Sequence, residues 1–342
     1  MKLDYSREEL LQSHDYAAPQ IEAGHRLHGG FLSDGRYVPP RTLGRAAAIE
    51  AWSEQLRKRG GDLLRADASL LAGVRYPSAA QQKLLLLEGL GQTFWNALTI
   101  TGEIEARGRL LAEMEFPDLQ DALVEDVSHM GVGHLNGGLL VAHGIDEGGE
   151  PSKGIGGHDL MWFAVRDLAF GETDHPHPEV PESITSPERE GPRIPEIGRA
   201  HERLVEFLCN LLLIEFRAER IFSLTEALLR DPELFSGRRA EAVHAAEIVN
   251  RIRADETIHV TSLRLYLGEL RSLTFRTRAG GTLPGAAVVD PLWEGVVHWA
   301  TIEQPKLQAE QQRQLLSKRI RNHPEAERVQ REFDALEDAP AA

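Results

Sequence analysis

Helical periodicity is the feature that most limits how this chain can fold. Apolar residues recur at helical spacing through most of the sequence, and no strand pattern competes with them. We therefore predict an all-α protein. The expected helical segments lie at about residues 43–60, 78–114, 118–143, 197–230, 239–272 and 289–320.

The breaks between these segments predict how the helices are connected. Phe116-Pro117-Asp118 places a proline and an acid where a helix would begin, and residues 231–237 separate two long helical segments. Residues 144–196 form a long connection whose second half is rich in proline and acid, as is typical of a surface loop. Two helical hairpins joined by one long crossover are an established topology of the four-helix bundle.

This arrangement predicts three parts along the chain. The four-helix bundle is expected over residues 81–275, with its long crossover at 144–196. Residues 1–80 are expected to form an N-terminal arm and a helix that pack on the bundle, because glycine and proline interrupt the first forty residues. Residues 276–342 are expected to form a C-terminal helical extension.

Composition and charge exclude several classes of partner. The chain of 342 residues has 53 acidic and 38 basic side chains and a formal net charge of −15. This charge repels a nucleic-acid backbone or an anionic membrane surface, so we expect neither partner. Cys209 is the single cysteine, and the polar N-terminal sequence lacks the apolar core of a signal peptide. We therefore expect a cytoplasmic protein.

One acidic residue lies where a helix core is expected. Glu215 is surrounded by Leu211, Leu212, Leu213, Ile214 and Phe216. A carboxylate in such a run is costly to bury unless it is paired, protonated or bound to a metal.

Two further segments share a pattern of two acids, two spacers and a histidine. The sequence VEDVSHMG contains Glu125, Asp126 and His129, and the sequence RADETIHV contains Asp255, Glu256 and His259. On a helix, a carboxylate and an imidazole three residues apart lie on one face, so each segment could offer an oxygen and a nitrogen to a metal. Two such helices would hold two metals.

A two-metal site also needs carboxylates from the other two bundle helices. Counting residues from the predicted turns places Glu103 close to the level of Asp126, and Glu215 close to the level of Glu256. Glu219 and Glu88 match these levels less well. Glu103 and Glu215 are therefore the candidate bridging ligands.

These residues resemble the carboxylate-bridged di-iron site of the ferritin-like superfamily, over about residues 85–270. The superfamily includes ferritins, rubrerythrins, ribonucleotide reductase small subunits and bacterial multicomponent monooxygenase hydroxylases. The resemblance implies the metal ligands Glu103, Asp126, His129, Glu215, Glu256 and His259. Asp126 stands where most members have glutamate, so Glu125 is an alternative ligand. The resemblance otherwise implies that Asp255 orients His129 and Glu125 orients His259.

The resemblance also implies a function. Such a site reacts with O2, so the chain is expected to be a non-haem di-iron oxygenase or oxidase that hydroxylates, desaturates or oxidises a small organic substrate. The cofactor would be two iron ions or a manganese–iron pair, since the candidate ligands include no thiolate. No cofactor-binding glycine loop is evident, so electrons would come from a separate donor or from the substrate. A homodimer is compatible with the sequence.

Two other functions fit the same residues. A ferroxidase or iron-binding ferritin-like protein would use the same ligands, and a non-catalytic helical scaffold would pair its buried acids with arginines such as Arg107, Arg217 and Arg253. The histidines of the crossover, His158, His175 and His177, are interpreted as part of a mobile loop rather than as a metal site.

Overall fold

The computed structural model describes residues 3–73, 75–187 and 190–336 and is predominantly helical, which confirms the all-α prediction. These residues also form two short antiparallel sheets. One pairs β1 (Gln20–Glu22) with β2 (His25–Leu27), and the other pairs β3 (Thr274–Arg276) with β4 (Thr282–Pro284). Within the described ranges, no helix has both the length and the apolar character needed to cross a membrane.

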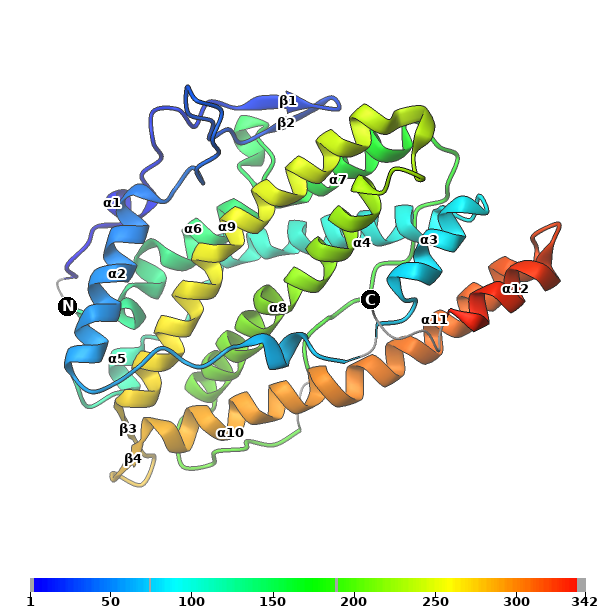
Figure 1. Cartoon of the computed structure of the whole chain (residues 1–342). Coiled ribbons are helices and arrows are strands. Elements are labelled where there is room, and N and C mark those ends of the chain that lie inside the picture. Colours follow the sequence, from blue (N-terminus) through cyan, green and yellow to red (C-terminus); the bar gives the residue numbers. More distant parts are fainter. Residues whose placement is uncertain (1–2, 74, 188–189, 337–342) are drawn as a thin grey trace.

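A hairpin of two long helices forms the centre of the molecule. Helix α8 (Arg199–Arg230) and helix α9 (Arg239–Ser272) run antiparallel and contact each other more extensively than any other pair of elements (Figure 1). Their bounds agree closely with the predicted segments, because neither helix contains a proline and the turn at residues 231–238 separates their two apolar patterns.

Three further helices pack beside this hairpin. Helix α4 (Gln92–Gly108) lies along α7 (His158–Phe170), which in turn packs against α9, and α6 (Leu140–Gly148) covers the end of α4. The chain leaves α6 at Gly149, whose φ of 65° belongs to the left-handed region that glycine adopts readily. A Cβ atom there would lie 2.3 Å from the Ile155 carbonyl oxygen, so glycine permits the close turn between α6 and α7.

The N-terminal residues form an arm against one side of the helices. Helix α1 (Arg7–Leu11) leads into an irregular stretch that includes β1 and β2, and α2 (Leu43–Lys58) then packs along α9 (Figure 1). Trp52 and Leu56 of α2 are buried in the main core. The arm is thus fixed to the body, and residues 28–45 reach the interior.

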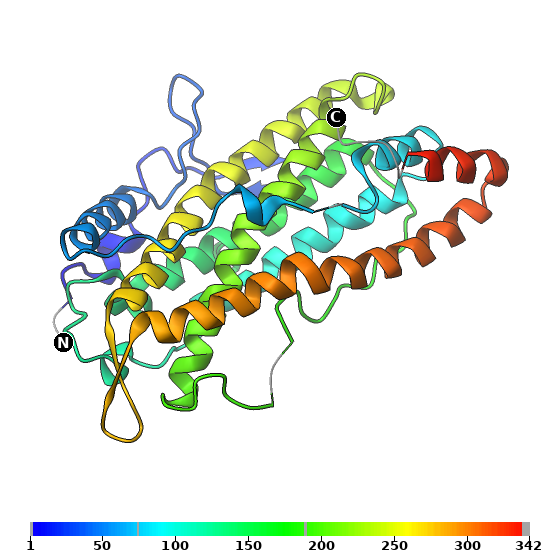
Figure 2. The same cartoon turned by 60° about the horizontal axis from the view of Figure 1, so that its bottom comes forward.

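The C-terminal helices cross another face of the molecule. Helix α10 (Gly285–His298) packs on α8 and α9, passes through a π-helical turn at Trp299–Glu303, and continues as α11 (Gln304–Arg321) (Figure 2). Helix α12 (Ala326–Ala335) folds back on α11. Together they bury a small separate apolar cluster with Leu85 of α3 (Ala79–Leu87).

Two of the helix predictions were wrong. Residues 118–143 do not form one helix: α5 (Leu119–Ala122) ends after one turn, and the backbone is irregular until short helical turns begin at Gly131. The Val124 N–H donates to the Thr274 carbonyl instead of continuing a helix. The segment predicted at 78–114 is likewise divided into α3 and α4 by residues 88–91. The second half of the crossover is irregular among its described residues, as predicted, whereas its first half contains the end of α6 and all of α7.

Candidate metal centre

Seven side chains of metal-ligand type converge between five helices. They form two groups that share Glu147, and within each group the ligand atoms lie within 4.8 Å of one another. Six of the side chains are buried, and Glu105 is half-buried. Site A consists of His143 and Glu147 from α6, Glu215 from α8 and His259 from α9; site B consists of Glu105 from α4, Glu147, His158 from α7 and Glu256 from α9.

Site A brings two imidazoles and two carboxylates together. His143 Nε2 lies 2.9 Å from Glu215 Oε1, and His259 Nδ1 lies 3.1 Å from Glu147 Oε1. The rings of His143 and His259 are stacked, with centroids 3.8 Å apart. The position four residues before Glu147 places His143 on the same face of α6.

Site B contains one imidazole and three carboxylates. His158 is the first residue of α7, and its Nδ1 lies 3.0 Å from Glu256 Oε1 and 3.4 Å from Glu147 Oε1. The turn after α6 brings His158 back toward Glu147, so one carboxylate faces both sites. Glu147 is therefore the member that the two groups share.

Two of the imidazoles also contact a carboxylate outside the cluster, through the ring nitrogen that points away from it. His259 Nε2 lies 3.1 Å from Asp146 Oδ2, and His158 Nε2 lies 3.1 Å from Asp255 Oδ2. Each contact leaves the Nδ1 atom facing the cluster. Such outer carboxylates fix the tautomer and the orientation of an imidazole that binds a metal.

The N-terminal arm contacts both outer carboxylates. Arg41 Nη2 lies 2.6 Å from Asp146 Oδ1, and Arg45 binds the other oxygen of the same carboxylate. On the other side, the Tyr37 hydroxyl donates to Asp255 Oδ2 at 2.9 Å. His28 Nε2 lies 3.2 Å from the same oxygen, so four side chains of residues 28–45 surround the cluster from one face.

Burial and mutual repulsion favour protons on two of the carboxylates. Burial, followed by the charges of Glu256 and Glu147, raises the pKa of Glu215 well above its usual value. Burial and the charge of Glu147 also raise the pKa of Glu105 well above its usual value. Without metal, both groups therefore tend toward the neutral acid.

The remaining groups form charged pairs. Burial alone would lower the pKa of His158 and His259, but the charges of Glu147 and Glu256 raise both values well above normal. Burial would raise the pKa of Glu256, yet the two imidazolium groups hold it at about 2. Burial and the charge of His259 lower the pKa of His143 to about 3. The metal-free cluster thus approaches electroneutrality by storing protons.

The donor set is of a kind that could hold metal. Glu147 Oε1 and His158 Nδ1 are buried and face the cluster, and their contacts of 3.0–3.4 Å with charged neighbours do not have the geometry of hydrogen bonds. A buried polar atom without a partner is costly, and a cation in contact with it would remove that cost. Carboxylates and imidazoles together suit Fe(II) and Mn(II).

The structure brings together three of the six ligands expected from the sequence. Glu215, Glu256 and His259 are in the cluster, whereas Glu103 is not. The Glu103 side chain is 39% exposed, and its Oε1 lies 3.2 Å from His177 Nε2. Glu105 lies two residues further along α4. Two residues correspond to a rotation of roughly 200° about the helix axis, so the side chain of Glu105 faces the cluster instead.

Asp126 and His129 also lie away from the cluster. Because residues 123–130 are not helical, the spacing of three does not place them on one face. Asp126 accepts a hydrogen bond from the Ser128 N–H, and the His129 side chain is 62% exposed and contacts Asp4. The structure therefore does not bring these two residues to the cluster.

The two expected supporting contacts also differ. Glu125 does not orient His259; its carboxylate accepts a hydrogen bond from the Thr274 N–H. Asp255 does support an imidazole, but that imidazole belongs to His158 rather than His129. The partner of His259 is Asp146.

Four members of the cluster were missed in the sequence: Glu105, His143, Glu147 and His158. His143 and Glu147 have the spacing of one helical face, but the predicted helix ended at residue 143. His158 was grouped with His175 and His177 in a loop, whereas it is fully buried in α7. His175 stacks edge-on against Trp95, and His177 is exposed beside Glu103.

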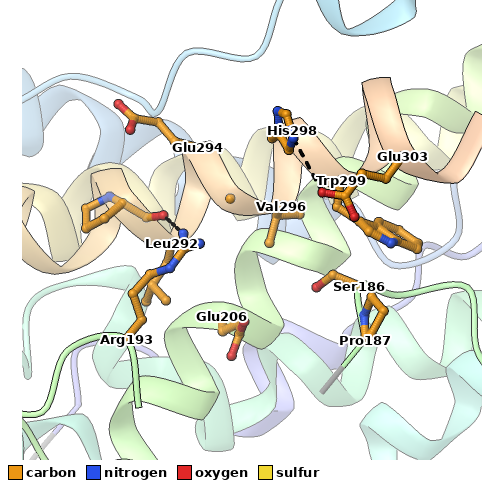
Figure 3. A pocket seen from close by; sticks show the side chains of 12 residues that line it. Ser186, Pro187, Arg193, Glu206, Leu292, Glu294, Val296, His298, Trp299 and Glu303 are labelled. Carbon is orange, nitrogen blue, oxygen red and sulfur yellow. Dashed lines mark hydrogen bonds and ion pairs between the residues drawn. The ribbon is translucent and has the colours of Figure 1, made fainter. Parts of the chain in front are cut away.

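A surface pocket of about 530 Å³ lies elsewhere, between α10, α8 and the crossover (Figure 3). Glu206, Arg193 and Trp299 are among its lining residues, and His298 Nε2 lies 3.4 Å from Glu303 Oε1 at its edge. Its lining includes no member of sites A and B. We therefore do not connect this pocket with the metal centre.

Comparison with known proteins gives no family assignment: no protein-family model, curated protein or solved structure matches this chain.

Proposed function

We propose that this chain is a ferritin-like dinuclear metalloenzyme that activates O2 to oxidise a small organic substrate. The observation that carries the proposal is the sharing of Glu147 by sites A and B. Two adjoining groups of carboxylates and imidazoles, joined by one carboxylate, are what a bridged pair of iron or manganese ions requires. When bound, such a pair supplies the electrons that reduce O2.

The residues around the cluster would orient the ligands and limit access of water. Asp146 and Asp255 contact Nε2 of His259 and His158, and would thereby leave Nδ1 of each ring free to hold a metal. Six buried ligand side chains keep bulk water away from the centre, which strengthens electrostatic interactions inside it.

Proton storage gives two carboxylic acids a further role. Glu215 and Glu105 carry protons when the site is empty and must lose them to bind metal.

The contacts of the arginines argue against a purely structural scaffold. That alternative requires the named arginines to neutralise the buried acids. Instead, Arg107 donates to the Pro181 and Glu182 carbonyls, Arg217 to the Leu70 carbonyl, and Arg253 to Glu219 and Glu226. These three arginines therefore do not neutralise the cluster, whose carboxylates contact imidazoles instead.

Metal analysis combined with O2 consumption tests the proposal. Purified protein reconstituted anaerobically with Fe(II) should hold about two iron ions per chain, and exposure to O2 should consume the gas. The Glu147→Ala variant should lose both properties. Less than half an equivalent of metal in the wild type would refute the dinuclear site. Two bound ions in a 24-subunit shell that accumulates ferric iron would favour the ferroxidase alternative.

The partners expected from the sequence remain part of the proposal. An oxidase of this kind needs a small organic substrate and, unless the substrate supplies all the electrons, a separate electron donor. Adding chemically reduced mediators to the iron-loaded protein should therefore increase the O2 consumed per chain.

A further inference from the structure

We infer that the surface pocket between α10, α8 and the crossover binds a short aliphatic polyamine, with Trp299 and Glu206 as its main contacts. The inference is independent of the proposed dinuclear function, because the lining of the pocket includes no member of sites A and B.

The pocket has the size of a small-molecule site. Its volume of about 530 Å³ lies within the range of roughly 300–1,000 Å³ that is usual for such sites. Leu292 and Val296 from α10 and Pro187 from the crossover give it apolar walls (Figure 3). These walls can contact the methylene groups of an organic ligand, which a bare metal ion does not have.

An aromatic ring forms part of the lining. Trp299 is half-buried and begins the π-helical turn Trp299–Glu303, and both end residues of that turn line the pocket. Turns of this kind are rare and are often found at functional sites. Tryptophan offers the most favourable aromatic face for an ammonium group, so the ring favours an organic cation over a neutral ligand.

The charged groups of the lining are mostly acidic. Glu206, Glu294 and Glu303 contribute three carboxylates, whereas Arg193 contributes one guanidinium. That guanidinium already donates to the Pro291 carbonyl (Figure 3). The field inside the pocket therefore attracts cations and repels anions.

Two of these carboxylates have no cationic partner within the part of the chain that the structure describes. There, neither Glu206 nor Glu294 forms an ion pair, and Glu303 lies 3.4 Å from His298. Glu206 is half-buried on α8, so its charge is screened less by solvent than that of a fully exposed acid. An ammonium group beside Glu206 would gain an ion pair without breaking an existing one.

The spacing of the acids favours a ligand with more than one ammonium group. Among the described residues, the lining acids belong to neither of the two groups whose ligand atoms lie within 4.8 Å of one another. One metal ion therefore could not contact all three carboxylates. A flexible polyamine can place separate ammonium groups near Glu206 on α8 and Glu303 beyond α10, with its methylene groups against Val296 (Figure 3).

Isothermal titration calorimetry with spermidine tests the site. The full chain would be titrated in about 0.15 M NaCl, where weak surface attraction is largely screened. We expect one equivalent to bind with a Kd below about 1 mM, and about tenfold more tightly than butylamine, which has a single ammonium group. A weaker Kd, equal affinity for butylamine, or equal displacement of spermidine by the same concentration of Mg(II) would overturn the inference.

Four variants test where spermidine binds. Trp299→Leu removes the aromatic face and should weaken binding about five- to tenfold, and Trp299→Phe should restore part of that loss. Glu206→Gln should weaken binding about three- to fivefold. Glu310→Gln is the matched control: it removes the same charge from α11, outside the pocket, and should leave the Kd unchanged.

Equal weakening by Glu206→Gln and Glu310→Gln would show that spermidine responds only to the net charge of the chain, and would overturn the assignment to this pocket. An unchanged Kd in folded Trp299→Leu would do the same for the aromatic contact. If that variant does not fold, the comparison of Glu206→Gln with Glu310→Gln still decides.

Discussion

Filling the empty cluster with two divalent cations should release protons, because metal ligands bind in their deprotonated forms. Raised pKa values identify four side chains that hold a proton without metal: Glu105, Glu215, His158 and His259. Up to four protons should therefore leave as both ions bind. Because protons and metals compete, the overall binding constant should rise with pH, by up to about 10⁴-fold per pH unit or ~5.5 kcal/mol.

Isothermal titration calorimetry measures this release directly. Anaerobic Fe(II) titrations near neutral pH, in buffers of different ionisation enthalpy, separate the heat of binding from the heat of buffer protonation. A Glu215→Gln variant provides the control, because glutamine mimics the neutral acid but carries no proton to lose; its total should fall by about one. Release of fewer than about one proton per two ions in the wild type would show that the ligands are already ionised, and the proposed storage would be wrong.

Three further outcomes are expected. Elemental analysis should show that Glu147→Ala loses both metals, whereas Glu103→Ala, on the exposed face of α4, keeps them. If Glu147→Ala kept one metal, Glu147 would not bridge the two positions. Asp146→Asn leaves two buried guanidinium groups without their carboxylate and should lower the free energy of unfolding by about 3–5 kcal/mol in urea, whereas Asp126→Asn should change it by under about 1 kcal/mol. His129→Ala should retain the full metal content, and a loss of one equivalent would restore the ligand role expected from the sequence.

The sequence predicted the long helices well because local and tertiary preferences agree there. In α8 and α9 the apolar stripe persists for more than seven turns, and the same stripe is buried in the core. Glu215, Glu256 and His259 lie on those stripes. Their position on the inner faces of these helices could therefore be predicted from periodicity.

The sequence prediction failed for the acid-acid-x-x-His segment at residues 125–129, because its local pattern is the same as that at residues 255–259. The two segments differ in backbone conformation, which depends on distant residues. Val124 pairs with Thr274, and the Asp126 side chain closes a local turn with the Ser128 N–H. A pairing across 150 positions leaves no periodic signal in the sequence.

The remaining ligands depend on helix rotation and on one turn. Both Glu103 and Glu105 are acids on α4, and only packing decides which faces inward. His158 joins Glu147 because the chain reverses near Gly149, and this reversal has no helical spacing. For these ligands the sequence shows the residue types, but it does not show which side of α4 faces inward or how the turn after α6 is formed.

The contacts of the N-terminal arm also set an order of folding. Arg41 and Asp146 are 105 residues apart, and Tyr37 and Asp255 are 218 residues apart. During synthesis the arm leaves the ribosome long before either acid exists, and closing such large loops is slow. We therefore expect the helices to assemble first and the arm to dock last. In the interval, the ligands would be gathered while one face of the cluster stood open, which gives a newly made chain a period in which metal can enter before residues 28–45 cover it.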